Sequence, residues 1–201
     1  MQLSAAYAAV QASAGDGNGF YRTLLLSFLQ HCTRTRQPVL VRRFADKFLA
    51  ATASVPNGSK AVATLHGLAD HLMDAVGFHE GEEERAVVNA INTGDFDTIM
   101  TAMMREVATR HILENPTTTV NGMSYATVAT SQARTLEAYC EAKVLPAGVE
   151  AHDLVLHAAP AALGVALRLV DMDRTQDEDL SHYDYGDGRP QCHVLLMDGQ
   201  Y

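Results

Sequence analysis

Apolar residues recur every three or four positions through most of this chain, the spacing that places them on one face of a helix. In the clearest case Phe20, Leu24 and Phe28 are four residues apart, with polar residues between them. The same pattern predicts helices over residues 20–32, 38–51, 61–76, 82–91, 96–113, 131–144 and 152–163.

Turn-forming residues mark where several of these helices begin and end. Pro38 suits the first turn of a helix, and the Asn57-Gly58 pair interrupts the pattern. Asp95 lies at an N-cap position, and Pro116 follows the end of the helix that begins there.

After residue 164 the apolar period changes from about four to two, which indicates β-structure. Val165, Leu167 and Leu169 alternate with other residues and predict a strand that continues to residue 173, and residues 193–197 predict a shorter one. The polar stretch 173–191 reads as a loop that exposes Tyr183 and Tyr185. The expected fold class is therefore α+β, with a helical region packed on a small sheet.

Composition limits what such a chain can be. With 201 residues, 47% of them hydrophobic, it can bury one core, so we expect a single domain over residues 1–201. Met100, Met103, Met104 and Met123 are expected to fill that core. A formal net charge of −9 argues against direct binding of nucleic acid, and no stretch is long and apolar enough to span a membrane.

Three cysteines favour a reducing, intracellular setting. Residues 1–14 contain no basic residue, so they resemble neither a secretory signal nor an Arg-rich presequence. The cytoplasm is the default expectation, and an organelle stays open if a targeting segment was removed. No cofactor or metal is expected, because the nine histidines are scattered and the acidic run 80–84 reads as a solvated turn.

The run Gly15-Asp16-Gly17-Asn18-Gly19 immediately precedes the first predicted helix. A helix N-terminus lowers the pKa of a thiol, so this is where a thiol protease places its nucleophile. With the following Phe20-Tyr21-Arg22, the run resembles D-G-N-C-F-Y-R of the otubain branch of the ovarian-tumour (OTU) deubiquitinases, except that Gly19 stands at the cysteine. Glycine keeps a backbone N–H but has no atom that can attack a carbonyl.

Further matches to otubains follow in the same order along the chain. Residues 133–140 resemble G-R-T-V-x-x-F-C, and residues 150–154 resemble E-x-D-H-I. Residues 195–201 resemble the otubain ending L-L-Y-R-P-G-H-Y-D-I-L-Y, in which the histidine is the general base and the aspartate orients it. Gln200 falls at that histidine, and an amide cannot exchange a proton near neutral pH. The acid and the strand that would carry it are absent from the sequence, unless residues follow Tyr201.

The resemblance implies an OTU, papain-like cysteine protease fold with a degenerate site at Asp16, Gly19 and Gln200. No other residues replace the missing chemistry. Cys192 and His193 are adjacent, so on a strand they point to opposite faces. Cys32 and Cys140 read as buried small apolar residues. We therefore expect no enzymatic activity.

The leading hypothesis is a structural or protein-interaction subunit of a larger intracellular assembly. The alternative is a non-catalytic regulator that binds ubiquitin or a ubiquitin-conjugating enzyme, since the otubain family includes members that hold both without cleavage. A third reading, an active thiol isopeptidase with an unrecognised nucleophile, is the weakest.

Overall fold

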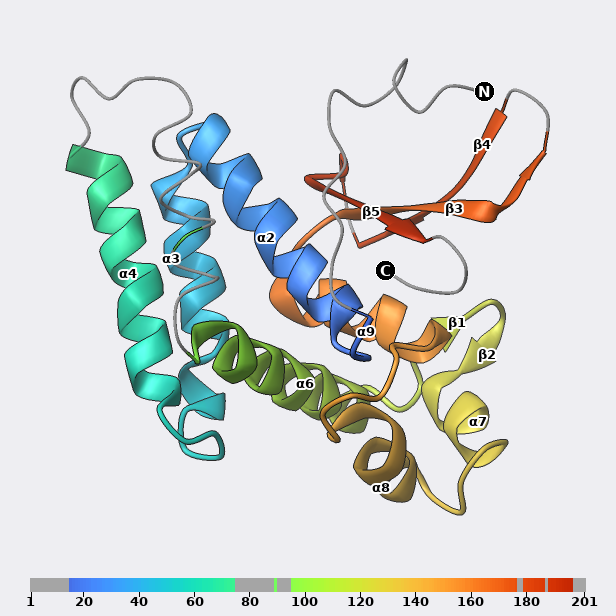
Figure 1. The fold of residues 1–201 in the computed structure, drawn as a ribbon. Helices are drawn as coiled ribbons and strands as arrows, with labels where there is room; N and C mark the ends of the chain where they lie inside the picture. Colours follow the sequence, from blue (N-terminus) through green and yellow to red (C-terminus); the bar gives the residue numbers. More distant parts are fainter. Residues whose placement is uncertain (1–14, 75–88, 90–94, 177–178, 187, 197–201) are drawn as a thin grey trace.

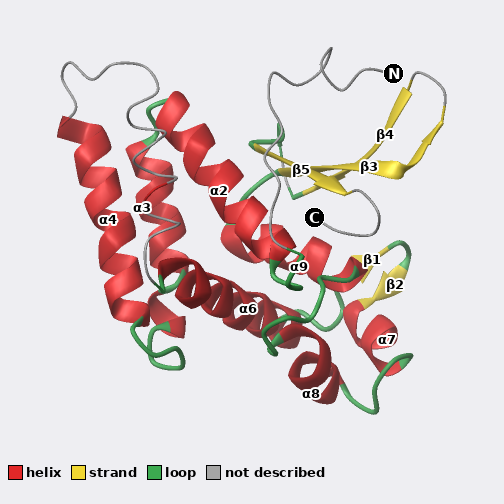
Figure 2. Ribbon diagram, viewed as in Figure 1, coloured by secondary structure: helices red, strands yellow, loops and turns green. Residues whose placement is uncertain are grey.

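The computed structural model describes residues 15–74, 89, 95–176, 179–186 and 188–196, and it has the α+β architecture that the sequence predicts. Helices form the larger part of the molecule, and a three-stranded sheet lies at one side of them (Figures 1 and 2). One buried hydrophobic cluster runs through the described residues from Phe20 at the first helix to Val194 in the last strand.

The first helices follow the apolar pattern closely. The structure has α2 (Gly19–Arg34), α3 (Pro38–Lys47), the 3-10 turn η1 (Leu49–Ala51) and α4 (Gly58–Asp74). The helix predicted over 38–51 therefore ends early, because the chain tightens into a 3-10 turn after Phe48. Asn57 adopts a left-handed φ of 60°, which explains the predicted break before α4.

The long helix α6 (Phe96–Glu114) crosses the centre of the molecule and packs against α2, α4 and α9 (Asp153–Leu163) (Figure 1). Met100, Met103 and Met104 are fully buried on it, as predicted. Asp95 occupies the N-cap position, but its side chain makes no capping hydrogen bond.

Between α6 and the next long helix, the structure contains elements that the sequence did not predict. They are a small hairpin, β1 (Thr119–Val120) with β2 (Met123–Ser124), and the short helix α7 (Tyr125–Thr130). The expectation that Met123 lies in the core is wrong, because the side chain is 51% exposed on β2.

The helix predicted over 131–144 begins later than expected, at α8 (Leu136–Tyr139), and continues as a π-helical turn, η2 (Cys140–Val144). Thr135 sets this start, because its Oγ1 accepts a hydrogen bond from the backbone N–H of Ala138 at 3.1 Å.

The sheet consists of β3 (Leu167–Gln176), β4 (Asp179–Tyr185) and β5 (Cys192–Leu196) in the order β4-β3-β5. β4 runs antiparallel to β3, and β5 runs parallel to it. The prediction of a loop over 173–191 is wrong for β4. This strand lies at the edge of the sheet and is polar, so it carries no apolar alternation that the sequence could have shown.

Side-chain contacts with β3 and α9 explain how the polar strand β4 is held in the sheet. Arg168 on β3 lies opposite Asp184 on β4 and donates two hydrogen bonds of 2.7 Å to its carboxylate. Tyr185 packs against the ring of His157 on α9, at 4.7 Å between centroids. The two tyrosines that the sequence placed in an exposed loop are therefore strand residues, and only Tyr183 is well exposed.

Several predictions fall outside the described residues: most of the helix over 82–91, the acidic run 80–84, and residues 197–201 with Gln200. Within the described part of the chain, no helix has the length and apolar character needed to cross a membrane.

Candidate functional site

The turn before α2 has the form that the sequence predicts. The Asp16 carboxylate accepts a hydrogen bond of 3.0 Å from the backbone N–H of Asn18. Gly17 has a φ of 76°, a left-handed conformation that glycine adopts without strain. Gly19 is the first residue of α2 and is buried, so the position that the resemblance assigns to a nucleophile lies at a helix N-terminus.

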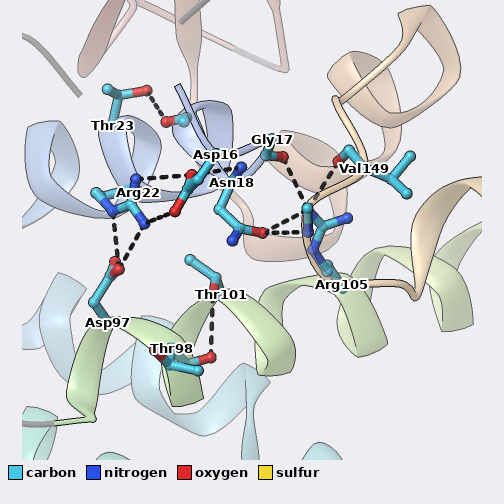
Figure 3. Close-up of polar contacts among 12 residues, drawn as sticks. Asp16, Gly17, Asn18, Arg22, Thr23, Asp97, Thr98, Thr101, Arg105 and Val149 are labelled. Carbon is cyan, nitrogen blue, oxygen red and sulfur yellow. Dashed lines mark hydrogen bonds and ion pairs between the residues drawn. The ribbon is translucent and has the colours of Figure 1, made fainter. Parts of the chain in front are cut away.

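Arg22 ties this turn to the start of α6 (Figure 3). Its guanidinium contacts the Asp16 carboxylate at 2.9 Å and the Asp97 carboxylate at 2.8 Å. Hydrogen bonding to Arg22 lowers the pKa of Asp16 to about 2. The same bond to Asp16, followed by the one to Asp97, raises the pKa of Arg22. Asp16 and Arg22 therefore stay charged across the physiological pH range.

Arg105, on α6, reaches under the turn and joins it to the chain that follows η2 (Figure 3). Its Nη2 donates to the carbonyl of Gly17 at 3.0 Å, to Oδ1 of Asn18 at 2.7 Å and to the carbonyl of Val149 at 2.9 Å. Its Nη1 donates to the carbonyl of Val144 at 2.8 Å. One side chain therefore holds two loops that are distant in sequence.

The surroundings of Arg105 are unusual for a cation. The side chain is 2% exposed, and none of the carboxylates described in the structure forms an ion pair with it. Burial lowers the pKa of its guanidinium. The group nevertheless stays protonated, because the ordinary pKa of an arginine lies far above neutrality. The Tyr21 ring lies 4.3 Å from the guanidinium carbon, a cation–π contact that offsets part of the desolvation.

The two loops held by Arg105 also meet directly. A Cβ atom placed on Gly17 would lie 2.0 Å from the carbonyl oxygen of Gly148. The backbone N–H of Gly148 donates to Oδ1 of Asn18 at 3.3 Å. The turn is therefore covered by backbone at Gly148, and only glycine fits at position 17.

None of the three cysteines lies in the surroundings of a reactive thiol. All are buried and without a disulfide. Burial raises the pKa of Cys32 to about 12 and that of Cys140 to about 11, and it raises the pKa of Cys192 as well. A nucleophilic cysteine needs the opposite shift. The prediction that Cys32 and Cys140 are buried small residues is confirmed.

Cys192 and His193 do point to opposite faces of β5, as the sequence predicts. Cys192 is fully buried and directs its Sγ toward the carbonyl of Leu24 at 3.9 Å, whereas His193 is exposed. The pair therefore cannot act as a thiol–imidazole dyad.

The described residues contain one cavity of note but no cluster of metal-ligating side chains. No group of three or more histidine, cysteine, aspartate or glutamate side chains there is arranged to hold a metal ion. A cavity of about 200 Å³ lies beside α7, α8 and α9, and no residue of the turn before α2 lines it. Its lining residues are Val128, Gln132, Tyr139, His152, Asp153 and Leu154.

Sequence reasoning located the turn but missed the two residues that fix it, Arg105 and Asp97. Their partners lie far away in sequence: 87 residues separate Arg105 from Asn18, and 75 separate Asp97 from Arg22. The sequence gives no signal for Arg105, because its neighbours one helical turn away, Thr101 and Thr109, are polar and only the structure shows that they are buried.

Comparisons with known proteins agree with this architecture. The sequence model of the family described as Peptidase C65 Otubain matches residues 1–197. The Arabidopsis thaliana protein named OVARIAN TUMOR DOMAIN-containing deubiquitinating enzyme 1 is 24% identical over an alignment 197 residues long, and the match covers 91% of this chain. The chain spans 61% of that relative's length.

Solved structures show the same fold. A complex of ceOTUB1 with ubiquitin aldehyde and UBC13~Ub has a TM-score of 0.66 at 20% identity, covering 94% of this chain and 76% of the other. A complex of h/ceOTUB1 with ubiquitin aldehyde and UBCH5B~Ub has a TM-score of 0.62 at 21% identity, with coverage of 94% and 73%. The fold is therefore the OTU cysteine protease fold that the resemblance predicts.

Proposed function

We propose that this chain, which belongs to the otubain family, Peptidase C65, is a non-catalytic member that acts by binding other proteins. The observation that carries the proposal is Gly19 at the first position of α2, where the family motif has its cysteine. The backbone of the nucleophile turn is present, but the attacking atom is not.

Two further observations support the same proposal. The sequence has Gln200 where the otubain motif has its general base, and a glutamine amide cannot take the proton of a thiol. The described cysteines, Cys32, Cys140 and Cys192, are buried with raised pKa values, so none of them substitutes for the nucleophile. The site at Asp16, Gly19 and Gln200 is, in this proposal, a degenerate cysteine-protease site.

A domain that has lost its catalytic residues still has a surface that can bind other proteins. We therefore assign the chain to a larger intracellular assembly as a structural or interaction subunit formed by one domain over residues 1–201. Three free thiols suit a reducing compartment. The hydrogen bonds and ion pairs of Arg22 and Arg105 hold the turn before α2 in place. A fixed turn of this kind suits a protein-binding surface and does not require catalysis.

A second candidate is a regulator that binds ubiquitin or a ubiquitin-conjugating enzyme. Its support is that the neighbouring solved structures are OTUB1 complexes that contain ubiquitin aldehyde and UBC13~Ub or UBCH5B~Ub. Binding of this kind needs the fold and its surface and does not need Gly19 to be a cysteine.

The test is a ubiquitin probe with a C-terminal thiol-reactive group, applied to the natural chain and to Gly19→Cys. We expect no covalent capture by the natural chain, and capture by any of its own cysteines would overturn the proposal. Capture by Gly19→Cys would favour the ubiquitin-binding candidate, because the probe must dock on the turn to react there.

Calorimetry with ubiquitin on the same samples separates the two binding roles. A measurable heat of binding to the natural chain supports the ubiquitin regulator. Absence of binding supports the assembly subunit, which copurification from the source organism then identifies.

A further inference from the structure

The outer face of α3 concentrates positive charge on a chain that is acidic overall. Residues 34–47 contain five arginines and lysines and a single acid, Asp46, whereas the whole chain has a formal net charge of −9. α3 lies beside α4 (Figure 1). Arg34 and Arg36, both exposed at the end of α2, add to the positive charge near the start of α3.

Polar contacts with α4 account for one edge of this face. Arg42 pairs with Asp70, and the His66 ring lies 3.6 Å from the Asp46 carboxylate. Arg43 and Lys47 are exposed and form no ion pair with the described residues. The only acid of α3 is therefore engaged, and these two cations are left to face solvent.

Arg43 and Lys47 lie in a row with one exposed apolar side chain, Val39, and a second exposed apolar residue, Leu49, follows just after the end of α3. Val39, Arg43 and Lys47 are four residues apart, so they follow one line along α3, opposite the buried side of the helix. Val39 is 55% exposed, and so is Leu49, which follows two residues after Lys47 in η1. We call these four residues the basic stripe.

We propose that the basic stripe is a docking surface for an acidic, amphipathic segment of a partner protein. Two cations one helical turn apart match two carboxylates one turn apart on a facing helix. Val39 and Leu49 at the ends offer apolar contact to flanking residues of that segment. The complementary charge would steer such a segment to this face and away from the acidic remainder.

The size and composition of the stripe favour protein over nucleic acid. A phosphate backbone needs an extended basic patch, and a chain of net charge −9 repels it elsewhere. The inference rests on the proposed function only in assigning the chain a binding role. Its test does not involve ubiquitin or the turn before α2, so this inference and the proposed function can fail separately.

The test is a titration of the full isotope-labelled chain with a synthetic helical peptide that carries two glutamates one turn apart between two leucines. We expect amide shifts centred on α3 and η1 that weaken as salt is added. The double variant Arg43→Glu/Lys47→Glu should lower the affinity at least about tenfold, since two pairs become repulsive. Val39→Ser should weaken binding without changing the charge.

The matched control is Arg134→Glu/Arg189→Glu, which reverses the same number of exposed cations elsewhere on the chain and should leave the affinity unchanged. The proposal is wrong if that control weakens binding equally, or if a peptide with glutamine in place of both glutamates binds as well. It is also wrong if single-stranded DNA or anionic vesicles bind the stripe as tightly as the peptide does.

Discussion

Gly17 and Gly148 meet backbone to backbone, with the carbonyl oxygen of Gly148 only 2.0 Å from where a Cβ on Gly17 would lie. The two residues come from segments 131 positions apart in the chain, and Gly148 donates a hydrogen bond to Asn18 beside that contact. The turn before α2 and the loop after η2 therefore behave as one unit.

Gly17→Ala should destabilise the protein by about 3 kcal/mol or more, since it adds both left-handed strain and a clash with backbone that has little room to move. Urea unfolding followed by circular dichroism measures the change. Gly122→Ala is the matched control, because Gly122 has a similar φ of 80° with nothing near its Cβ position. That control should cost only about 1 kcal/mol, and equal losses in the two variants would show that the close contact is unimportant.

Arg105→Met should destabilise the protein by about 3 kcal/mol. An apolar replacement is often harmless for a buried ion pair, but here it would leave three backbone carbonyls and the Asn18 side chain without their donor. Chemical denaturation is the measurement. Arg105→Lys should recover only part of the lost stability. Lysine keeps the positive charge, but its ammonium group cannot reproduce the planar set of N–H donors of the guanidinium.

Arg134→Met provides the comparison for Arg105, because Arg134 is exposed and should tolerate the change within about 0.5 kcal/mol. If Arg105→Met is no more destabilising than this exposed change, Arg105 does not hold the two loops together.

The three cysteines should be protected from thiol reagents in the folded protein. Burial and raised pKa values leave very little thiolate at neutral pH, so modification should be at least about a hundredfold slower than in denaturing urea. Mass spectrometry after timed labelling gives the rate at each residue. Rapid modification of any one cysteine in the native protein would contradict the conclusion that none of the three can act as a nucleophile.

The sequence predicted the long helices, because one side of each is apolar over several turns. α2 and α6 have buried residues three and four positions apart, and their predicted ends differ from the structure by no more than two residues. β4 was missed because an edge strand gains its stability from backbone pairing and from contacts such as Arg168–Asp184. Such contacts leave no periodic pattern in the sequence.

The candidate site was predictable in its local part only. Asp16, Gly17 and Gly19 belong to one short continuous stretch of sequence, and the turn that this stretch predicts is present before α2. Arg105 lies in the middle of an unrelated helix, and nothing near it in sequence indicates that it would bind Asn18 and Val149. Long-range polar contacts of this kind require the three-dimensional structure.

The Asp16–Arg22 pair should make stability fall in acid over a defined range. The pKa of Asp16 is about 2 in the folded protein against 3.8 ordinarily, so the unfolded chain takes up this proton first as the pH falls. The contribution of the pair is therefore complete above about pH 4 and is lost between about pH 4 and pH 2. Because the Asp16 side chain is 45% exposed, solvent screening keeps that contribution below about 1 kcal/mol. Asp16→Asn should flatten this part of the stability profile, measured as the urea midpoint against pH. An unchanged slope in Asp16→Asn would mean that other carboxylates govern the acid sensitivity.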